Sequence, residues 1–483
     1  MALSNATVWE VRSTGNDQNG GGFVAGLGGV DRSQQDPAFA TGTAMSVSGT
    51  VNTDVLPGGG YTPGAADVGN VIQVRAATGW TIGFYQIASI QGAYWRLDRS
   101  PAAAGTTGGV WSLGGALATL GQALGGFVTG NYVWLKSGTY NLAAGVTFPG
   151  GTFPSVAQTN KLLGYYLARG DITPYQNAAQ RPVLKAAGPN LSLLSVPGYM
   201  SVENLTIDGV GLANTSGITI TGGNGGIINC LVRNVVGTPV TLAGACLLLH
   251  SEVTGCTAAG GAVFSSNHGS RVVECWVHDN AGPGLALQNP SSGQAHIVTG
   301  NIISNNTGPS SDGIQTDHAS FFLNNTIHGN GRYGIICTTN YTSIQIYHNN
   351  LFTMNGAAGL AFQLGPPPLA PNFRHDGNCY WANTGGNRVL GDGTGADDPR
   401  YASGPYANYY DKTLTADPYV NRGANDFRLN NVAGGGADAR GAGVPRDWPG
   451  NAMANRIDFG TAQHADPAAA ATVAFPVIGR VVA

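Results

Sequence analysis

Acidic, imidazole and indole side chains are concentrated between residues 250 and 278 of this 483-residue chain. The cluster contains His250, Glu252, Glu274, Trp276 and His278. Two carboxyl groups held about 6.5–9.5 Å apart can hydrolyse a glycosidic bond, one as general acid and the other as general base. An indole beside them can stack on a sugar. We therefore predict Glu252 and Glu274 as candidate catalytic residues, and His250, Trp276 and His278 as candidate ligand-binding residues. The alternative is that these carboxylates and histidines only pair with each other on a sheet face.

A second candidate is the segment SSDGIQTDHASFF, with Asp312 and Asp317 as further candidate catalytic residues. It resembles the Asp-rich strand of polygalacturonase-like enzymes, although the Asp-Asp, Gly-His-Gly and Arg-Ile-Lys elements of that family are absent. Asp312 precedes a glycine, which is also typical of a corner residue. Asp317 is expected to share a row with three polar residues that form a candidate hydroxyl-binding groove: Gln288, Thr338 and Gln363.

These residues lie in a region of internal repeats. Seven segments of eight residues recur between residues 202 and 353, and the spacing of their sixth residues is 21 to 26. Those sixth residues are aliphatic: Ile207, Val232, Val253, Val277, Ile303, Ile327 and Leu351. Each segment is followed by a second short apolar run beginning at Ile218, Val240, Val263, Leu285, Ile314, Ile335 and Leu360. A period of this length with short strands and no helical pattern predicts a β-solenoid.

Stacked coils place equivalent residues about 4.8 Å apart. We expect even positions of each segment to face the core and odd positions to face solvent. Glu252 and Trp276 then share a column, and Glu252 and Glu274 lie about 8 Å apart. The fourth positions include an amide column of Asn301, Asn325 and Asn349, and inward free cysteines at Cys230 and Cys275. Asp208 and Arg233 are predicted to pair across adjacent coils.

The repeat resembles the right-handed parallel β-helix of the pectate-lyase-like superfamily, which includes phage tailspikes and carbohydrate-active enzymes. GGALATLGQALGGFVTGNYVWLKSGTYNL (114–142) is similar to the entry of such folds, with a capping helix, a strand and a Gly-Thr-Tyr corner. LTADPYVNRGANDFRLNNVAGGGADARGAG (414–443) resembles their closing segment. The resemblance implies an all-β fold but leaves the chemistry open, because one scaffold carries many functions.

The chain is expected to divide into four parts. Residues 1–113 form an N-terminal β-rich region, and residues 114–365 form the β-helix. Residues 366–465 form irregular final coils and a cap, and residues 466–483 form an apolar C-terminal arm. The 75 glycines are attributed to coil corners, where the backbone needs positive φ.

Composition excludes several classes of partner. Only 10% of residues are charged, the net charge is −3, and no basic stripe suggests nucleic-acid binding. We find no membrane span, no signal peptide, and no metal or cofactor site. We expect a protein made in the cytoplasm and located on a virion surface or outside the cell.

Three functions are compatible with these observations. The first is a virion-associated, spike-like protein that binds a polysaccharide or cell-surface glycan, with other virion proteins as partners and a homotrimer by analogy with tailspikes. The second is a polysaccharide-degrading enzyme, a glycoside hydrolase more than a lyase. The third is a purely structural coat or decoration protein.

Overall fold

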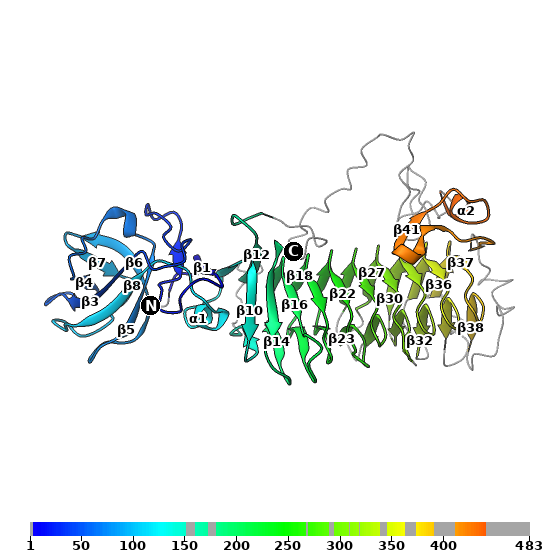
Figure 1. Ribbon diagram of the computed structural model, residues 1–483, viewed down its shortest axis with the longest axis horizontal. Coiled ribbons are helices and arrows are strands. Elements are labelled where there is room, and N and C mark those ends of the chain that lie inside the picture. The colour runs from blue at the N-terminus through cyan, green and yellow to red at the C-terminus, as the bar shows by residue number, and fades with distance from the viewer. Residues whose placement is uncertain are drawn as a thin grey trace. The chain divides into compact units, whose positions relative to one another are not determined.

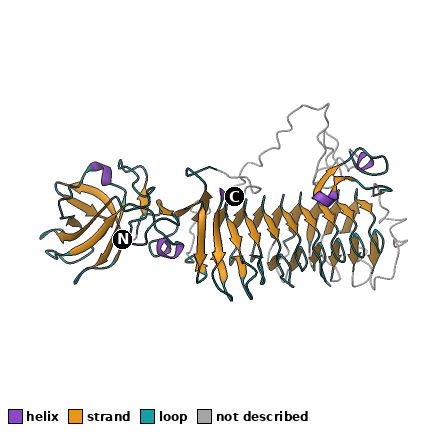
Figure 2. Cartoon of the chain, in the orientation of Figure 1, coloured by secondary structure: helices purple, strands orange, loops and turns teal. Residues whose placement is uncertain are grey.

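The structure is a computed structural model that describes residues 3–150, 160–171, 180–266, 269–288, 294–308, 310–317, 319–338, 345–362, 373–390 and 411–440. Almost all regular structure in these residues is β-strand (Figures 1 and 2). The chain divides into two compact units. The first contains residues 1–187 and 193–207, and the second contains residues 188–192 and 208–483.

The first unit contains an antiparallel closed barrel of six strands. Its strands are β3 (Ala40–Val47), β4 (Asp54–Leu56), β5 (Val71–Ala76), β6 (Gly83–Gln91), β7 (Tyr94–Leu97) and β8 (Gly109–Leu113). Trp95 and Trp111 meet edge to face inside it, with ring centroids 4.8 Å apart, and Tyr61 packs on both. The alternating apolar positions of these strands close over this aromatic core.

The same unit contains the first coils of the solenoid. Strand β1 (Thr7–Val11) pairs antiparallel with β2 (Gly22–Val24) and parallel with β9 (Tyr132–Lys136). Helix α1 (Leu120–Leu124) is capped by the Thr119 side chain and precedes β9, as the sequence resemblance implied. The other strands of these coils are β10 (Gly138–Leu142), β11 (Val146–Thr147), β12 (Asn160–Tyr165), β13 (Pro182–Ala186), β14 (Ser192–Val196), β15 (Met200–Glu203) and β16 (Thr206–Asp208).

Three parallel sheets wind through the second unit, and each coil contributes one strand to each sheet. The first sheet contains β18 (Gly226–Ile228), β21 (Leu247–Leu249), β24 (Arg271–Val273), β27 (His296–Thr299), β30 (Ser320–Leu323), β33 (Gln345–His348) and β36 (Phe373–Asp376). The second sheet contains β19 (Leu231–Arg233), β22 (Glu252–Thr254), β25 (Trp276–His278), β28 (Ile302–Ser304), β31 (Thr326–His328), β34 (Leu351–Thr353), β37 (Cys379–Trp381) and β39 (Lys412–Thr413). The third sheet contains β17 (Ser216–Ile220), β20 (Val240–Leu242), β23 (Val263–Ser266), β26 (Leu285–Gln288), β29 (Ile314–Thr316), β32 (Ile335–Cys337), β35 (Leu360–Phe362) and β38 (Arg388–Leu390).

The two predicted apolar ladders form the inward rows of the second and third sheets. In the second sheet Val232, Val253, Val277, Ile303 and Ile327 pair in succession and are fully buried. In the third sheet the predicted row from Ile218 to Leu360 pairs residue by residue. The predicted all-β, parallel β-helix fold is therefore confirmed.

The last predicted repeat is wrong by one residue. Ile327 pairs with Phe352, so Phe352 and not Leu351 continues the inward row. The same shift places Asn350, and not Asn349, in the amide column. Leu351 is apolar for a different reason: it faces outward and is covered by the segment of residues 414–439 described below.

Stacked asparagines form two buried columns between the coils. The first contains Asn301, Asn325, Asn350 and Asn378, in which each amide nitrogen donates to the next side-chain oxygen at 2.9–3.0 Å. The second contains Asn280, Asn306, Asn330, Asn355 and Asn383, in which each amide nitrogen donates to the next side-chain oxygen at 2.9–3.1 Å. Each amide also donates to a backbone carbonyl, so these polar groups are satisfied inside the core. The second column was not predicted.

A C-terminal segment covers the outward side of the later strands of the second sheet. It contains β40 (Tyr419–Asn421), the 3-10 turn η5 (Arg422–Ala424), β41 (Asp426–Leu429) and helix α2 (Gly436–Ala439), and its strands lie beside the coils in Figure 1. Its apolar side chains form one cluster with the sheet: Leu351, Cys379, Leu414, Tyr419, Phe427, Leu429 and Ala439. Among the described residues, this segment covers the later strands and leaves the outward side of the earlier coils of the second sheet uncovered.

Candidate functional site

The earlier coils of the second sheet carry the cluster predicted from the sequence. Glu252 pairs with Trp276 in register, as expected, while Val253 and Val277 face the core between the outward positions. Glu252 and Trp276 are half-buried, and His278 lies beside Trp276 on the same face with its side chain 8% exposed. The parallel pairing of β22 and β25 thus brings two coils of polar and aromatic side chains together.

His250 and Glu274 lie at a corner between the first and second sheets. Both have positive φ, 48° and 51°, so the chain turns there and does not continue as one strand. The predicted separation of about 8 Å between Glu252 and Glu274 assumed an extended chain through residue 274 and does not apply. In the other coils of the second unit this corner is occupied by Asn or Gly: Asn229, Gly300, Asn324, Asn349 and Gly377.

Each carboxylate of the cluster contacts a histidine. Glu274 Oε2 hydrogen-bonds His250 Nε2, and both side chains are about half exposed, at 54% and 51%. Glu252 Oε1 lies 3.1 Å from His278 Nε2. Asp279, which sequence reasoning did not single out, lies 2.7 Å from His278 Nδ1 through its Oδ2 atom. Its position directly after His278 was the available signal.

Trp276 forms the aromatic part of this surface. Its ring stacks on the His278 ring with centroids 3.7 Å apart and planes 21° apart. Its indole nitrogen donates to Ser304 Oγ at 3.3 Å. These contacts fix the indole in one orientation and cover one face of its ring with His278, so the opposite face is the one that can act as a rigid apolar platform. We refer to His250, Glu252, Glu274, Trp276, His278 and Asp279 as the Trp276 cluster.

Asp312 occupies a different environment. Its side chain is fully buried, and its two oxygens accept hydrogen bonds from Arg332 at 2.8 and 2.6 Å. It also accepts from the Tyr333 backbone N–H at 3.2 Å. This bidentate bond raises the pKa of the Arg332 guanidinium. These contacts give Asp312 a structural role: it holds its corner to Arg332 and to the Tyr333 backbone.

The predicted polar row beside Asp317 is found in part. The pairing of Leu287 with Thr316 places Gln288 and Asp317 next in the same row, where Gln288 is exposed and Asp317 is half-buried. Thr338 is half-buried, and its hydroxyl donates to the Thr316 carbonyl at 3.3 Å. Gln363 lies outside the described residues.

Other predicted contacts are present. Arg233 Nε donates to Asp208 Oδ2 at 2.9 Å, and the Asn234 amide donates to the same carboxylate at 3.1 Å. Cys230 and Cys275 are buried free thiols, as predicted. Burial raises the pKa of the Cys275 thiol to about 12.

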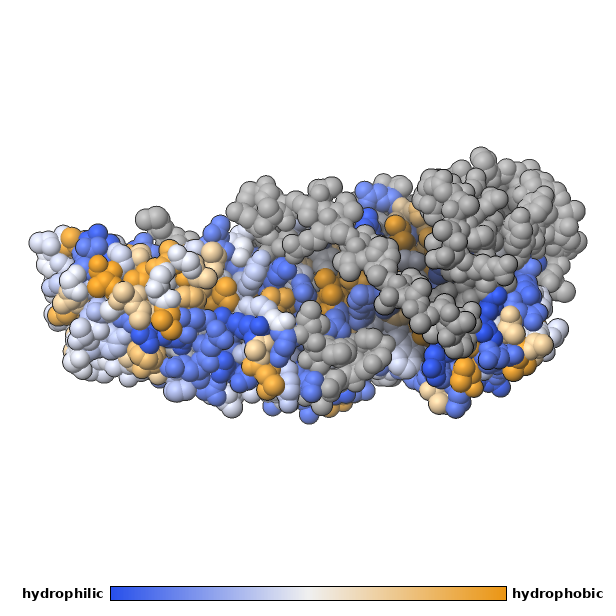
Figure 3. All heavy atoms as spheres, turned by 90° about the horizontal axis from the view of Figure 1, so that it is seen from above, coloured by the Kyte–Doolittle hydropathy of each residue, from blue (hydrophilic) through white to orange (hydrophobic). Residues whose placement is uncertain are grey.

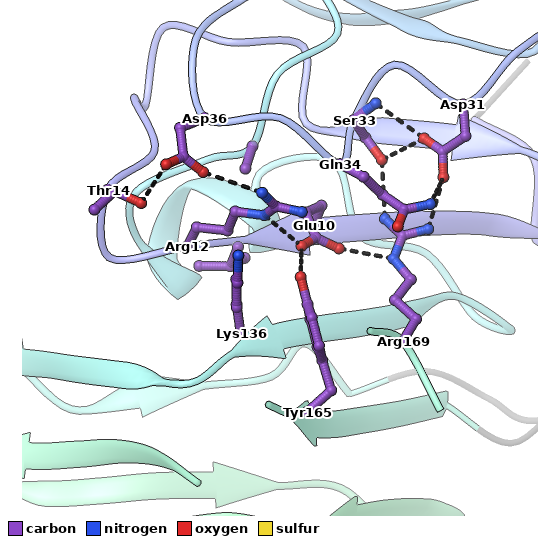
Figure 4. A network of polar contacts seen from close by, with 12 residues as sticks. Glu10, Arg12, Thr14, Asp31, Ser33, Gln34, Asp36, Lys136, Tyr165 and Arg169 are labelled. Carbon is purple, nitrogen blue, oxygen red and sulfur yellow. Dashed lines mark hydrogen bonds and ion pairs between the residues drawn. The ribbon is translucent and has the colours of Figure 1, made fainter. Parts of the chain in front are cut away.

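The first unit contains a separate polar network around Glu10 on β1 (Figure 4). The fully buried Glu10 carboxylate accepts from Arg12 Nε at 2.8 Å and Arg169 Nε at 2.7 Å, and it also contacts the Tyr165 hydroxyl. Arg169 continues to Asp31 at 2.8 Å. Burial and the Glu10 charge raise the pKa of Tyr165. The central carboxylate is inaccessible to solvent, so we assign the network a structural role. Its contacts join β1, β12 and the loop that contains Asp31.

The described ranges contain no helix long and apolar enough to cross a membrane. In the same residues, no group of three or more His, Cys, Asp and Glu side chains is arranged to hold a metal ion. On the face seen in Figure 3, hydrophilic and hydrophobic side chains are interspersed.

Comparisons with known proteins agree with the architecture. Residues 195–360 match the sequence family described as right handed beta helix region. The structure is similar to the crystal structure of pectate lyase Pel9A, with TM-score 0.51 and 14% identity, covering 72% of this chain and 92% of that one. The chain therefore contains a right-handed parallel β-helix.

Two further structures are similar to a smaller part of the chain. The A-module of mannuronan C-5 epimerase AlgE4 from Azotobacter vinelandii has a TM-score of 0.36 and 14% identity, covering 54% of this chain and 85% of that one. ORF18 of Geobacillus virus E2 has a TM-score of 0.30 and 12% identity, covering 55% and 50%. A comparison with curated proteins found no match.

Proposed function

We propose that this β-helix protein binds a glycan on the outward face of β22 and β25, with Trp276 as the stacking platform. The observation that carries the proposal is the partly exposed indole held by His278 and Ser304, with carboxylates and imidazoles around it. Sugar rings present apolar C–H faces and a rim of hydroxyls, and this surface offers a matching apolar plane and polar rim.

Binding is favoured over catalysis because the carboxylates are engaged by histidines. Inverting hydrolysis needs one protonated acid and one carboxylate base on opposite sides of the scissile bond. Glu252 is held by His278 and Glu274 by His250, on a strand and at a corner respectively. We propose a virion-associated, adhesive role for the binding protein, with a homo-oligomer and other virion proteins as partners outside the cell.

The test is binding of the whole protein to a panel of soluble polysaccharides. Trp276→Ala is expected to weaken binding at least about tenfold, equivalent to about 1.4 kcal/mol, while Trp276→Phe retains most of it. Phe264→Ala is the matched control, because Phe264 is a half-buried aromatic residue on β23, in the third sheet. Equal affinity of the wild type and Trp276→Ala would contradict the proposed site, and absence of any glycan binding would favour a purely structural protein.

The enzymatic alternative is tested in the same panel. The expected result is no release of oligosaccharides during prolonged incubation. Release that disappears in Glu252→Gln or Glu274→Gln would replace the binding proposal with a hydrolase that uses these carboxylates.

A further inference from the structure

The Trp276 cluster carries an excess of negative charge. It contains three carboxylates, Glu252, Glu274 and Asp279, and two imidazoles, His250 and His278. Its formal charge is therefore −3 with both imidazoles neutral and −1 with both protonated. A glycan that bears a carboxylate on each sugar meets net repulsion here in either state.

The neighbouring guanidinium groups do not reverse this balance. Arg233, on the adjacent strand β19, is already bound by Asp208 at 2.9 Å. Arg271 is exposed, but it lies at the start of β24 on the first sheet, before the corner at Glu274. The only arginine on β19, β22 or β25 is therefore already paired with Asp208. It is not available to neutralise the carboxylates of the Trp276 cluster or to bind an anionic sugar.

The corner residues of the cluster are unusual for their backbone. His250 and Glu274 adopt positive φ, which Asn and Gly tolerate better than other residues. Asn or Gly occupies this corner in the other described coils of the second unit, so the two exceptions are adjacent, exposed and bonded to each other. Residues kept in a strained conformation mark positions where the side chain is needed for another reason.

From these observations we propose that the Trp276 cluster selects neutral or amino-sugar glycans and rejects polyuronates, with the His250–Glu274 corner as a specificity-determining pair. The inference rests on the proposed glycan binding. Hydroxyl and ammonium groups of such a ligand donate hydrogen bonds to the carboxylates beside the indole, and an ammonium group also gains from their charge. A uronate carboxylate can neither donate a hydrogen bond to these carboxylates nor be attracted by their charge.

The experiment measures affinity for four soluble probes: chitosan oligosaccharides, dextran, polygalacturonate and alginate. The wild type is expected to bind a neutral or amino-sugar probe at least about tenfold more tightly than either polyuronate. Glu252→Gln with Asp279→Asn is expected to narrow that ratio, because it removes two negative charges. Tighter binding of a polyuronate by the wild type would overturn the inference and leave the proposed function intact, whereas no binding of any probe would overturn the proposed function.

A second variant tests the corner. His250→Asn combined with Glu274→Asn replaces both residues with one that the corner accepts elsewhere, so we expect an equal or higher Tm. Affinity for the preferred probe is expected to fall at least about fivefold, because hydrogen bonds from the ligand to this pair are lost. Unchanged affinity in this folded variant would remove the corner from the site, and Asn324→Gly, at an equivalent corner two coils away, is the control that should alter neither binding nor fold.

Discussion

The register of the amide column makes a direct prediction about stability. Asn350 is fully buried, and its side-chain oxygen accepts from the Asn325 backbone N–H at 3.1 Å and the Asn325 amide at 2.9 Å. Its own amide donates to the Phe322 carbonyl at 2.8 Å. Asn350→Ala leaves these three groups without that partner, and each buried group left unsatisfied costs at least about 1 kcal/mol. We expect a loss of roughly 3 kcal/mol or more in unfolding free energy.

The adjacent Asn349 is the matched comparison. It has φ of 54° at a corner, where glycine is sterically unhindered. Asn349 is also buried, but glycine relieves the strain of this φ, so Asn349→Gly is expected to cost less unfolding free energy than Asn350→Ala. The spacing of the sequence repeats instead places Asn349 in the amide column. It therefore predicts that Asn349→Gly loses more unfolding free energy than Asn350→Ala.

The assay is urea unfolding followed by far-ultraviolet circular dichroism, with the midpoint compared at constant slope. Because solenoid coils can unfold locally, hydrogen exchange of the amides in β31 and β34 provides a second measurement. A larger loss in Asn349→Gly than in Asn350→Ala would refute the register and the reasoning about the buried amides.

Three further predictions concern buried charges. Glu10→Ala should lower the unfolding free energy by about 3–5 kcal/mol, because two arginines lose their buried carboxylate partner. Asp36→Asn, at the exposed end of the same network, should lower it by less than about 1 kcal/mol. Equal unfolding midpoints of the two variants in urea would contradict this. Arg332→Ala should cost about 3 kcal/mol or more because Asp312 stays buried without its cation, and a neutral effect in the same assay would be the contrary result. Burial lowers the pKa of His328 from 6.5 to about 4. The neutral imidazole therefore contributes roughly 3 kcal/mol to the unfolding free energy above pH 6.5, and this contribution is lost as the pH falls through 4. Tm measured between pH 4 and 7 should fall less steeply in His328→Gln, and parallel curves would exclude His328 as the cause.

The inward rows could be predicted from the sequence because one physical requirement produced them. Positions such as Val253 and Val277 stack directly and exclude water, so their aliphatic character recurs at the spacing of the coils. The prediction failed at Leu351 for a related reason. An outward residue covered by Tyr419 and Phe427 is selected for the same apolar character as an inward one, and spacing does not separate the two.

The candidate site was only partly predictable. The pairing of Glu252 with Trp276 on adjacent strands followed from register alone. The pairing of Glu274 with His250 depends on a corner, which is hard to anticipate because neither residue favours positive φ. Local steric preference predicted an extended strand there, and the requirements of the coil overrode it.

A crystal structure with a bound oligosaccharide from the binding panel tests the central claim most directly. The account predicts a sugar ring stacked on Trp276, with its hydroxyl or ammonium groups within hydrogen-bonding distance of the carboxylates of the Trp276 cluster. A ligand bound on the first or third sheet, with Trp276 uncontacted, would contradict it.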